Sequence, residues 1–138
     1  MFLALASLLL ATAIGIALRL RDGRFRQVRD RADHPLAALA SGTTATFVQF
    51  SSQTCSVCPR SLAVLRGVAG LRPGVDVVEV GAEEHMDLVR LLDVRRSPTV
   101  FLLDADGAVH ARTSGAMNAE LAGTALDDLL ERTTRVAS

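Results

Sequence analysis

Apolar and polar positions along the chain follow two patterns, one typical of buried strands and the other of amphipathic helices. Short runs rich in β-forming residues, at 45–50, 75–80 and 99–103, predict three strands. Between them, apolar residues recur at helical spacing after Pro59 and again from Met86 to Leu92. The middle of the chain therefore predicts strands that alternate with helices.

The last third of the chain predicts a hairpin and a final helix. A turn at residues 104–107 follows the third strand, and residues 108–113 return as the second arm. Asn118 is a suitable N-cap for the helix that follows. The apolar stripe of that helix consists of Leu121, Ala125, Leu126, Leu129 and Leu130. The order β-α-β-α-β-β-α predicts an α/β fold with a central mixed β-sheet flanked by helices on both faces.

The first eighteen residues, MFLALASLLLATAIGIAL, carry no charged side chain. As a helix they would reach roughly 27 Å, near the lower limit for crossing a bilayer. We interpret residues 1–20 as a transmembrane anchor. A cleaved signal peptide is the alternative, disfavoured because no basic side chain precedes the apolar run and no small-x-small cleavage site stands out after it.

The charged segment that follows, residues 21–34, is expected to be a tether, although residues 25–28 could form a short first strand. Residues 35–138 then form one domain, long enough for a packed core. Basic residues cluster directly after the apolar run, at Arg19, Arg21, Arg24, Arg26, Arg29 and Arg31. The positive-inside rule places such a segment in the cytoplasm, so we expect a single-pass membrane protein with a cytoplasmic domain, the exported orientation being the alternative.

Composition argues against a nucleic-acid partner. Fifteen basic and fifteen acidic residues balance, so no charge excess would attract a polyanion. The chain has no Trp and no Tyr, and aromatic platforms for stacking bases are therefore scarce.

The stretch TCSVCP contains the only two cysteines of the chain, Cys55 and Cys58. A structural zinc site needs four ligands, and the three histidines lie far apart in the sequence. A structural disulfide that closes so small a loop gains little in the chain-entropy account. The redox interpretation is favoured because the pair lies between a predicted strand and a predicted helix. Unpaired N–H groups at the helix N-terminus would favour a thiolate there.

In this interpretation Cys55, the first and more exposed cysteine, attacks a partner's disulfide. Cys58, one helical turn further on, resolves the mixed disulfide. No nucleotide-binding fingerprint such as GxGxxG is present, so electrons must come from an external donor. We expect no cofactor beyond the cysteine pair and no bound metal.

These features resemble the thioredoxin family over about residues 43–136. The resemblance depends on the strand before Cys55-Ser56-Val57-Cys58, the Ser97-Pro98-Thr99 step, and the spacing of Gly107 and Gly115. It implies a thioredoxin-like fold in which the bond before Pro98 is cis and faces the cysteines. It also implies that the Ser97 backbone and the residue before the first cysteine, Thr54, contact the substrate.

Three positions depart from the family pattern. Thr54 stands where the family usually has Trp, and Gln49 where it has a buried acid that assists proton transfer. Gln cannot act as a base, so another group must take the proton. The sequence alone leaves open whether Gln49 faces the core or the solvent. Pro59 suits the first helical position with Cys58 as the cap.

The sequence thus predicts a membrane-tethered thiol–disulfide oxidoreductase that acts as a reductase on a membrane-associated protein client. Two alternatives remain. One is an extracytoplasmic thioredoxin-like protein in cytochrome or disulfide maturation. The other is a non-catalytic thioredoxin-fold module whose dithiol binds a soft metal such as Cu(I).

Overall fold

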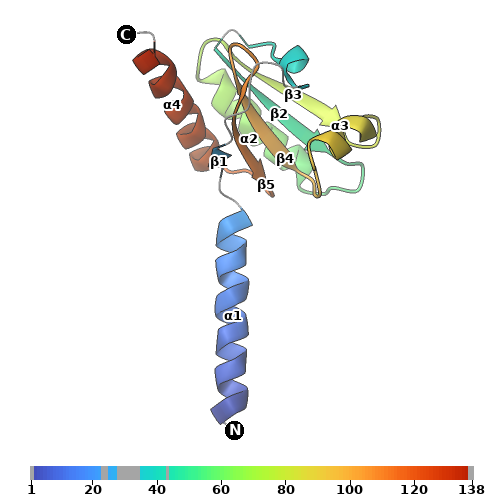
Figure 1. The fold of residues 1–138 in the computed structure, drawn as a ribbon, viewed down its shortest axis with the longest axis vertical. Helices are drawn as coiled ribbons and strands as arrows, with labels where there is room; N and C mark the ends of the chain where they lie inside the picture. Colours follow the sequence, from blue (N-terminus) through green and yellow to red (C-terminus); the bar gives the residue numbers. More distant parts are fainter. Residues whose placement is uncertain (1, 23–24, 28–34, 43, 137–138) are drawn as a thin grey trace.

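The structure is a computed structural model that describes residues 2–22, 25–27, 35–42 and 44–136. Figure 1 shows a long helix followed by an α/β domain. Its elements are α1 (Phe2–Asp22), β1 (Arg26–Gln27), the 3-10 helix η1 (Ala37–Leu39), β2 (Ala45–Ser51), α2 (Cys58–Gly70), β3 (Val75–Gly81), α3 (Met86–Leu91), β4 (Thr99–Asp104), β5 (Val109–Ser114) and α4 (Ala119–Val136). The predicted alternation of strands and helices is confirmed.

The five strands form one sheet in the order β1-β5-β4-β2-β3. β2 and β3 are parallel, whereas β2–β4, β4–β5 and β1–β5 are antiparallel, so the sheet is mixed as predicted. β1 is the short first strand that residues 25–28 suggested, although residue 28 lies outside the described residues, as do residues 29–34 of the expected tether. The antiparallel hairpin β4–β5 closes through the predicted turn.

Both faces of the sheet are buried, and each has its own apolar cluster. On one face, Phe47 of β2 packs in a cluster with Leu65 of α2 and Leu126 of α4. On the other face, Val48 and Phe50 pack in a cluster with Leu92, which follows α3. Leu88 of α3 and Leu39 of η1 pack against this second cluster. Successive strand residues point to opposite faces, so the side chains of β2 alternate between the two faces, and all seven residues are buried. This arrangement decides where Gln49 lies.

The helix ends agree closely with the sequence pattern, with one correction. The Asn118 side chain accepts a 2.8 Å hydrogen bond from the Leu121 backbone N–H, which confirms Asn118 as the N-cap of α4. At α2 the cap is Val57 and the helix already begins at Cys58, so Pro59 is not the first helical residue. The prediction that Cys58 caps this helix was therefore wrong by one position.

Helix α1 stands apart from the sheet in Figure 1. Its described apolar side chains are exposed, for example Leu8 (67%), Leu9 (68%) and Leu10 (63%). Among the described residues, no helix has the length and the hydrophobicity that a membrane crossing requires.

Candidate active site

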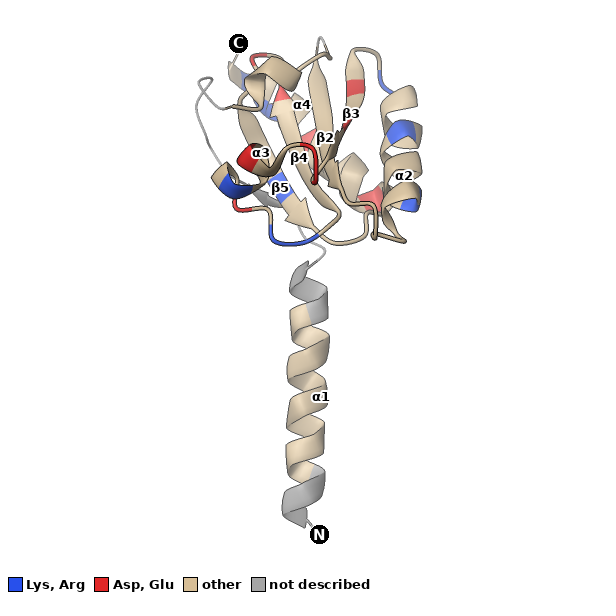
Figure 2. Cartoon of the chain, turned by 90° about the vertical axis from the view of Figure 1, so that its right-hand side faces the viewer, with Lys and Arg blue, Asp and Glu red and all other residues tan. Residues whose placement is uncertain are grey.

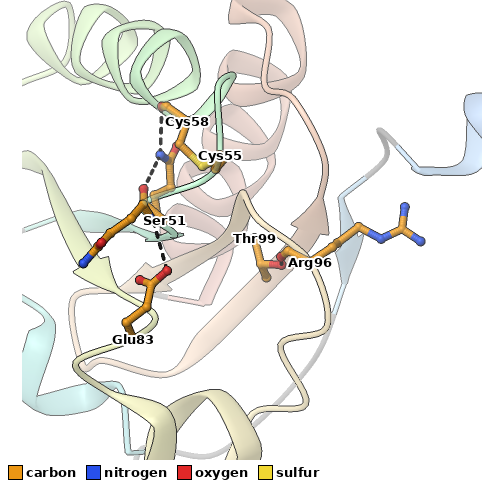
Figure 3. The surroundings of a disulfide bond; sticks show 8 residues. Ser51, Cys55, Cys58, Glu83, Arg96 and Thr99 are labelled. Carbon is orange, nitrogen blue, oxygen red and sulfur yellow. Dashed lines mark hydrogen bonds between the residues drawn. A yellow bond between two sulfur atoms is a disulfide. The ribbon is translucent and has the colours of Figure 1, made fainter.

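The two cysteines lie where β2 leads into α2 and form a disulfide, with their Cα atoms 5.5 Å apart. β2 ends at Ser51, and the chain then turns so that the Cys55 N–H donates to the Ser52 carbonyl at 3.1 Å. Cys58 opens the first turn of α2. Figure 3 shows the sulfur pair between the end of the sheet and this first turn. The strand and helix predicted on either side of the pair thus bring the two sulfur atoms within bonding distance.

The two sulfur-bearing residues differ in their exposure. Cys58 is 2% exposed, whereas Cys55 is only partly buried. The residues that flank Cys55 on the surface, Thr54 and Ser56, are exposed, and so is Val57 at 44%. An incoming sulfur atom can therefore approach Cys55, while Cys58 is covered by the protein.

Gln49 is fully buried and contacts the backbone of Cys58. Its Nε2 donates to the Cys58 carbonyl and to the Ser51 hydroxyl, both at 3.0 Å (Figure 3). The alternative that Gln49 faces solvent is wrong, because α2 and α4 cover the face of the sheet to which it points. The amide therefore connects the floor of the site to the residue expected to resolve the mixed disulfide.

Two buried polar atoms near this floor have no hydrogen-bond partner among the described residues: Gln49 Oε1 and Ser61 Oγ. Ser61 lies on α2 one turn after Cys58, and its N–H donates to the Val57 carbonyl at 3.0 Å. Burying an unpaired polar atom costs about 1–3 kcal/mol. Buried polar atoms without a partner are uncommon in an apolar core and are often found at functional sites.

Glu83, which sequence analysis did not single out, holds the loop before the disulfide. Its Oε1 accepts a 3.0 Å hydrogen bond from the Gln53 N–H, and the neighbouring Ala82 N–H donates to the Ser51 carbonyl at 2.8 Å. Figure 3 shows Glu83 reaching this loop from the segment after β3. The contact joins residues thirty positions apart, and no local motif in the sequence marks it.

The Ser97–Pro98 peptide bond is cis, which matches the prediction. Phe50 of β2 pairs with Thr99 of β4. Pro98 directly precedes Thr99, so it lies at the end of the sheet where the chain leaves β2 toward Cys55. Pro98 is buried, Ser97 is partly exposed, and the Pro98 carbonyl accepts a 2.8 Å hydrogen bond from the Gly115 N–H. The structure therefore brings the two segments of the predicted site to one edge; the contacts of Ser97, Pro98 and Thr54 with substrate stay predictions.

The loop before the cis bond carries charge. The Arg95 Nε donates to the Asp93 carboxylate at 2.8 Å, and this hydrogen bond lowers the pKa of the exposed Asp93 side chain. The Thr99 hydroxyl donates to the Arg96 carbonyl at 2.7 Å, which ties the loop to the start of β4 (Figure 3). Within the described part of the chain, no group of three or more His, Cys, Asp or Glu side chains is placed to hold a metal ion.

No protein-family model matches the chain, and no curated protein matches it in sequence. Solved structures do match it in fold. Chloroplastic thioredoxin z is similar at a TM-score of 0.58 and 26% identity, covering 75% of this chain and 95% of that one. A thioredoxin-like protein from Clostridium perfringens is similar at a TM-score of 0.54 and 25% identity, covering 65% of this chain and 74% of that one.

A third match is the oxidised form of mitochondrial thioredoxin 3 from Saccharomyces cerevisiae. It has a TM-score of 0.53 and 21% identity, and the match covers 70% of this chain and 85% of that one. These neighbours agree with the fold that the sequence predicted.

Proposed function

From the premise that this chain is a thioredoxin-like protein, we propose that it is a membrane-tethered thiol–disulfide oxidoreductase that reduces a protein client. The thioredoxin-like fold and the disulfide between Cys55 and Cys58 support thiol–disulfide exchange as its activity. The observation that carries the proposal is the unequal burial of the two cysteines at the entry to α2.

Exchange proceeds in two displacement steps. In the reduced protein the Cys55 thiolate attacks one sulfur of the client disulfide, forming a mixed disulfide and releasing the other client sulfur as a thiolate. The Cys58 thiolate then attacks Cys55 Sγ, which releases the second client sulfur and leaves Cys55–Cys58 oxidised. Two electrons have passed to the client, and an external dithiol donor restores the reduced protein.

Burial supports this assignment of the two roles. Attack on a client disulfide needs an accessible sulfur, which suits the partly exposed Cys55. Resolution is intramolecular, so it needs proximity and not access, which suits the 2% exposed Cys58. The partly exposed Ser97 at the same edge is the candidate position at which the backbone of the client docks.

The tether is proposed from the N-terminal segment. Residues 1–18 carry no charged side chain, α1 extends through 21 residues, and its described apolar side chains are exposed. The six arginines between residues 19 and 31 favour a cytoplasmic domain. Cytoplasmic glutathione and thioredoxin would keep the pair reduced, which favours the reductase direction.

Trapping in native membranes tests the proposal. In a Cys58→Ser variant the mixed disulfide cannot be resolved, so Cys55 should stay covalently attached to its client. We expect a reductant-sensitive adduct in the membrane fraction, absent from the matched Cys55→Ser/Cys58→Ser control. Mass spectrometry of the adduct identifies the client and its linked cysteine, and the position of that cysteine in the client's membrane topology gives the side on which exchange occurs. A client on the exported side would reverse the proposed orientation.

The midpoint potential of the pair separates enzyme from binding module. A reversible two-electron couple between about −300 and −120 mV supports exchange chemistry. Tight one-to-one Cu(I) binding without turnover of a disulfide substrate would overturn the oxidoreductase proposal in favour of a soft-metal module.

A further inference from the structure

The chain enters its domain from the end of the sheet at which the disulfide lies. β1 is antiparallel to β5, with Arg26 opposite Arg112. β5 continues from Arg112 to Ser114, which pairs with Thr99, the residue directly after Pro98. Arg112 in turn pairs with Phe101, so Arg26 is level with the middle of β4, two residues from Thr99. Because β1 runs away from Thr99, the chain enters the sheet from the end where the cis-proline and the cysteine pair lie. We call this end the redox edge.

Phe25, which directly precedes β1, secures this point of entry. Its side chain is partly buried and packs against the apolar cluster formed with α2 and α4. Figures 1 and 2 show α1 below the end of the sheet where β5 stops, and the β4–β5 turn at the far end. The long helix is thus connected to the domain next to the redox edge and not at the opposite end.

Chain length keeps the redox edge close to the end of α1. Arg26 follows Asp22, the last residue of α1, by four residues, which span at most about 14 Å. β1 and β2 are three strand spacings apart in the sheet, roughly 14 Å. The turn at residues 104–107 lies at the other end of β4 from the redox edge, roughly 20 Å away for six residues.

We infer that the disulfide faces the membrane surface, and that its client is an integral membrane protein whose cysteine pair lies at the level of the lipid headgroups. This inference rests on the membrane tether proposed above. The segment from Asp22 to Arg26, which spans at most about 14 Å, is short compared with a folded domain of a hundred residues, whose radius of gyration alone is about 13 Å. Folded soluble proteins therefore have restricted access to the redox edge, whereas thiols at the membrane surface can reach it.

The exposed Arg96 directly precedes Ser97 at the redox edge, and Arg95 before it is paired with Asp93. Arginines at the cytoplasmic membrane surface are attracted to anionic headgroups.

Distance to lipid tests the geometry in the full chain. The protein is reconstituted in nanodiscs of phosphatidylcholine and phosphatidylglycerol that contain headgroup-labelled quencher lipid. A fluorophore is attached to Cys55 in the Cys58→Ser variant. The matched control carries it at Asp106→Cys, on the far turn, in a Cys55→Ser/Cys58→Ser background. We expect markedly stronger quenching at position 55 than at position 106.

The outcomes separate the two proposals. Failure of the chain to insert into the nanodiscs overturns the tether and this inference together. Insertion with equal or stronger quenching at position 106 overturns only the inference that the redox edge faces the membrane.

A spacer tests the consequence for client choice. A flexible Gly/Ser insert of about twenty residues between Asp22 and Gly23 would let the domain move away from the bilayer. In single-turnover assays with pre-reduced protein in nanodiscs, we expect the insert to raise the rate with a soluble disulfide-bonded protein by about tenfold. The rate with a small-molecule disulfide should not change. Equal rates for parent and insert with the protein substrate would overturn the inference.

Discussion

The two ends of the sheet differ in how far their polar groups are paired and covered. At the far end, the turn at residues 104–107 is closed by its own hydrogen bonds: Asp104 Oδ1 accepts from the Asp106 and Ala108 N–H groups at 3.0 and 2.9 Å. Gly107, at φ 79°, packs against Ala37 of η1. At the redox edge, Cys55 and Ser97 stay partly exposed, and Gln49 Oε1 is buried without a partner among the described residues.

This difference separates stability from chemistry. The far turn satisfies its own polar groups and rests on the second apolar cluster, so changes there should alter folding more than exchange. The redox edge combines an accessible sulfur with a buried polar floor. Substitutions of its exposed residues should alter exchange, whereas substitutions of its buried residues should also alter folding. Variants at the two ends can show whether the division holds.

The largest effect is expected for Cys55→Ser. Without the accessible sulfur no mixed disulfide forms, so reduction of a protein disulfide should fall to the uncatalysed background. The assay is single-turnover reduction by pre-reduced protein, with circular dichroism to confirm folding. Cys58→Ser is the matched variant and should still complete the first displacement. Substantial exchange by Cys55→Ser would refute the assigned roles.

Gln49→Glu should be the most destabilising change at the floor of the site. An oxygen replaces the Nε2 that donates to the Cys58 carbonyl, and the buried carboxyl loses its hydration. We expect a loss of roughly 2–4 kcal/mol at neutral pH. The exposed Gln53→Glu is the matched control and should cost little.

The loss at Gln49→Glu should depend on pH in a defined direction. Burial raises the folded pKa of the new carboxyl above its unfolded value of about 4.3. The folded state then binds more protons between the two values, so stability should fall as pH rises from the unfolded to the folded pKa. Urea midpoints at several pH values measure this. A midpoint that stays constant with pH would show that the carboxyl is solvated.

At the far end, Gly107→Ala should destabilise the domain by about 2 kcal/mol or more. Its φ of 79° disfavours a side chain, and a Cβ there would lie 2.7 Å from Ala37 Cα. The exchange rate of the folded protein should stay at the parent value. Gly67→Ala is the matched control: a Cβ there meets nothing within 4 Å, so this helical change should stabilise by about 0.5–1 kcal/mol. Equal effects of the two substitutions would remove the special role of the turn.

The smallest effect is expected at the contact between α4 and β5, where Asp128 lies 3.1 Å from His110 Nε2. Burial by itself raises the pKa of Asp128, but hydrogen bonds with His110 and Arg132 outweigh it, and the pKa lies below its usual value. Asp128→Asn should cost about 0.5 kcal/mol at neutral pH, as for an exposed pair. Because the folded pKa is depressed, this contribution is present above the unfolded pKa and is lost as pH falls through the folded one. Thermal unfolding of variant and parent should therefore converge in acid; a cost that persists there would assign the effect to packing.

Much of the fold could be predicted because its signals are local. Apolar runs at 45–50, 75–80 and 99–103 fall within β2, β3 and β4, and Asn118 caps α4 as its side chain suggested. The cysteine pair could be placed for the same reason, since a strand and a helix flank it directly in sequence.

The floor of the site could not be predicted, because its contacts are long-range. Whether Gln49 faces solvent depends on α2 and α4 covering that face of the sheet, which periodicity within β2 does not reveal. Glu83 reaches the Gln53 N–H across thirty residues without any motif. The place where β1 joins the sheet was equally hidden, because two residues carry too little pattern to fix a partner strand.

The amide beneath Cys58 carries zero charge whether the sulfur pair is joined or open. Opening the pair therefore forces no second acid in the interior to change its ionisation at the same moment. The reduction potential of the cysteine pair should then depend on pH through the two thiols alone. A plot of that potential against pH should show no further change of slope near neutral pH.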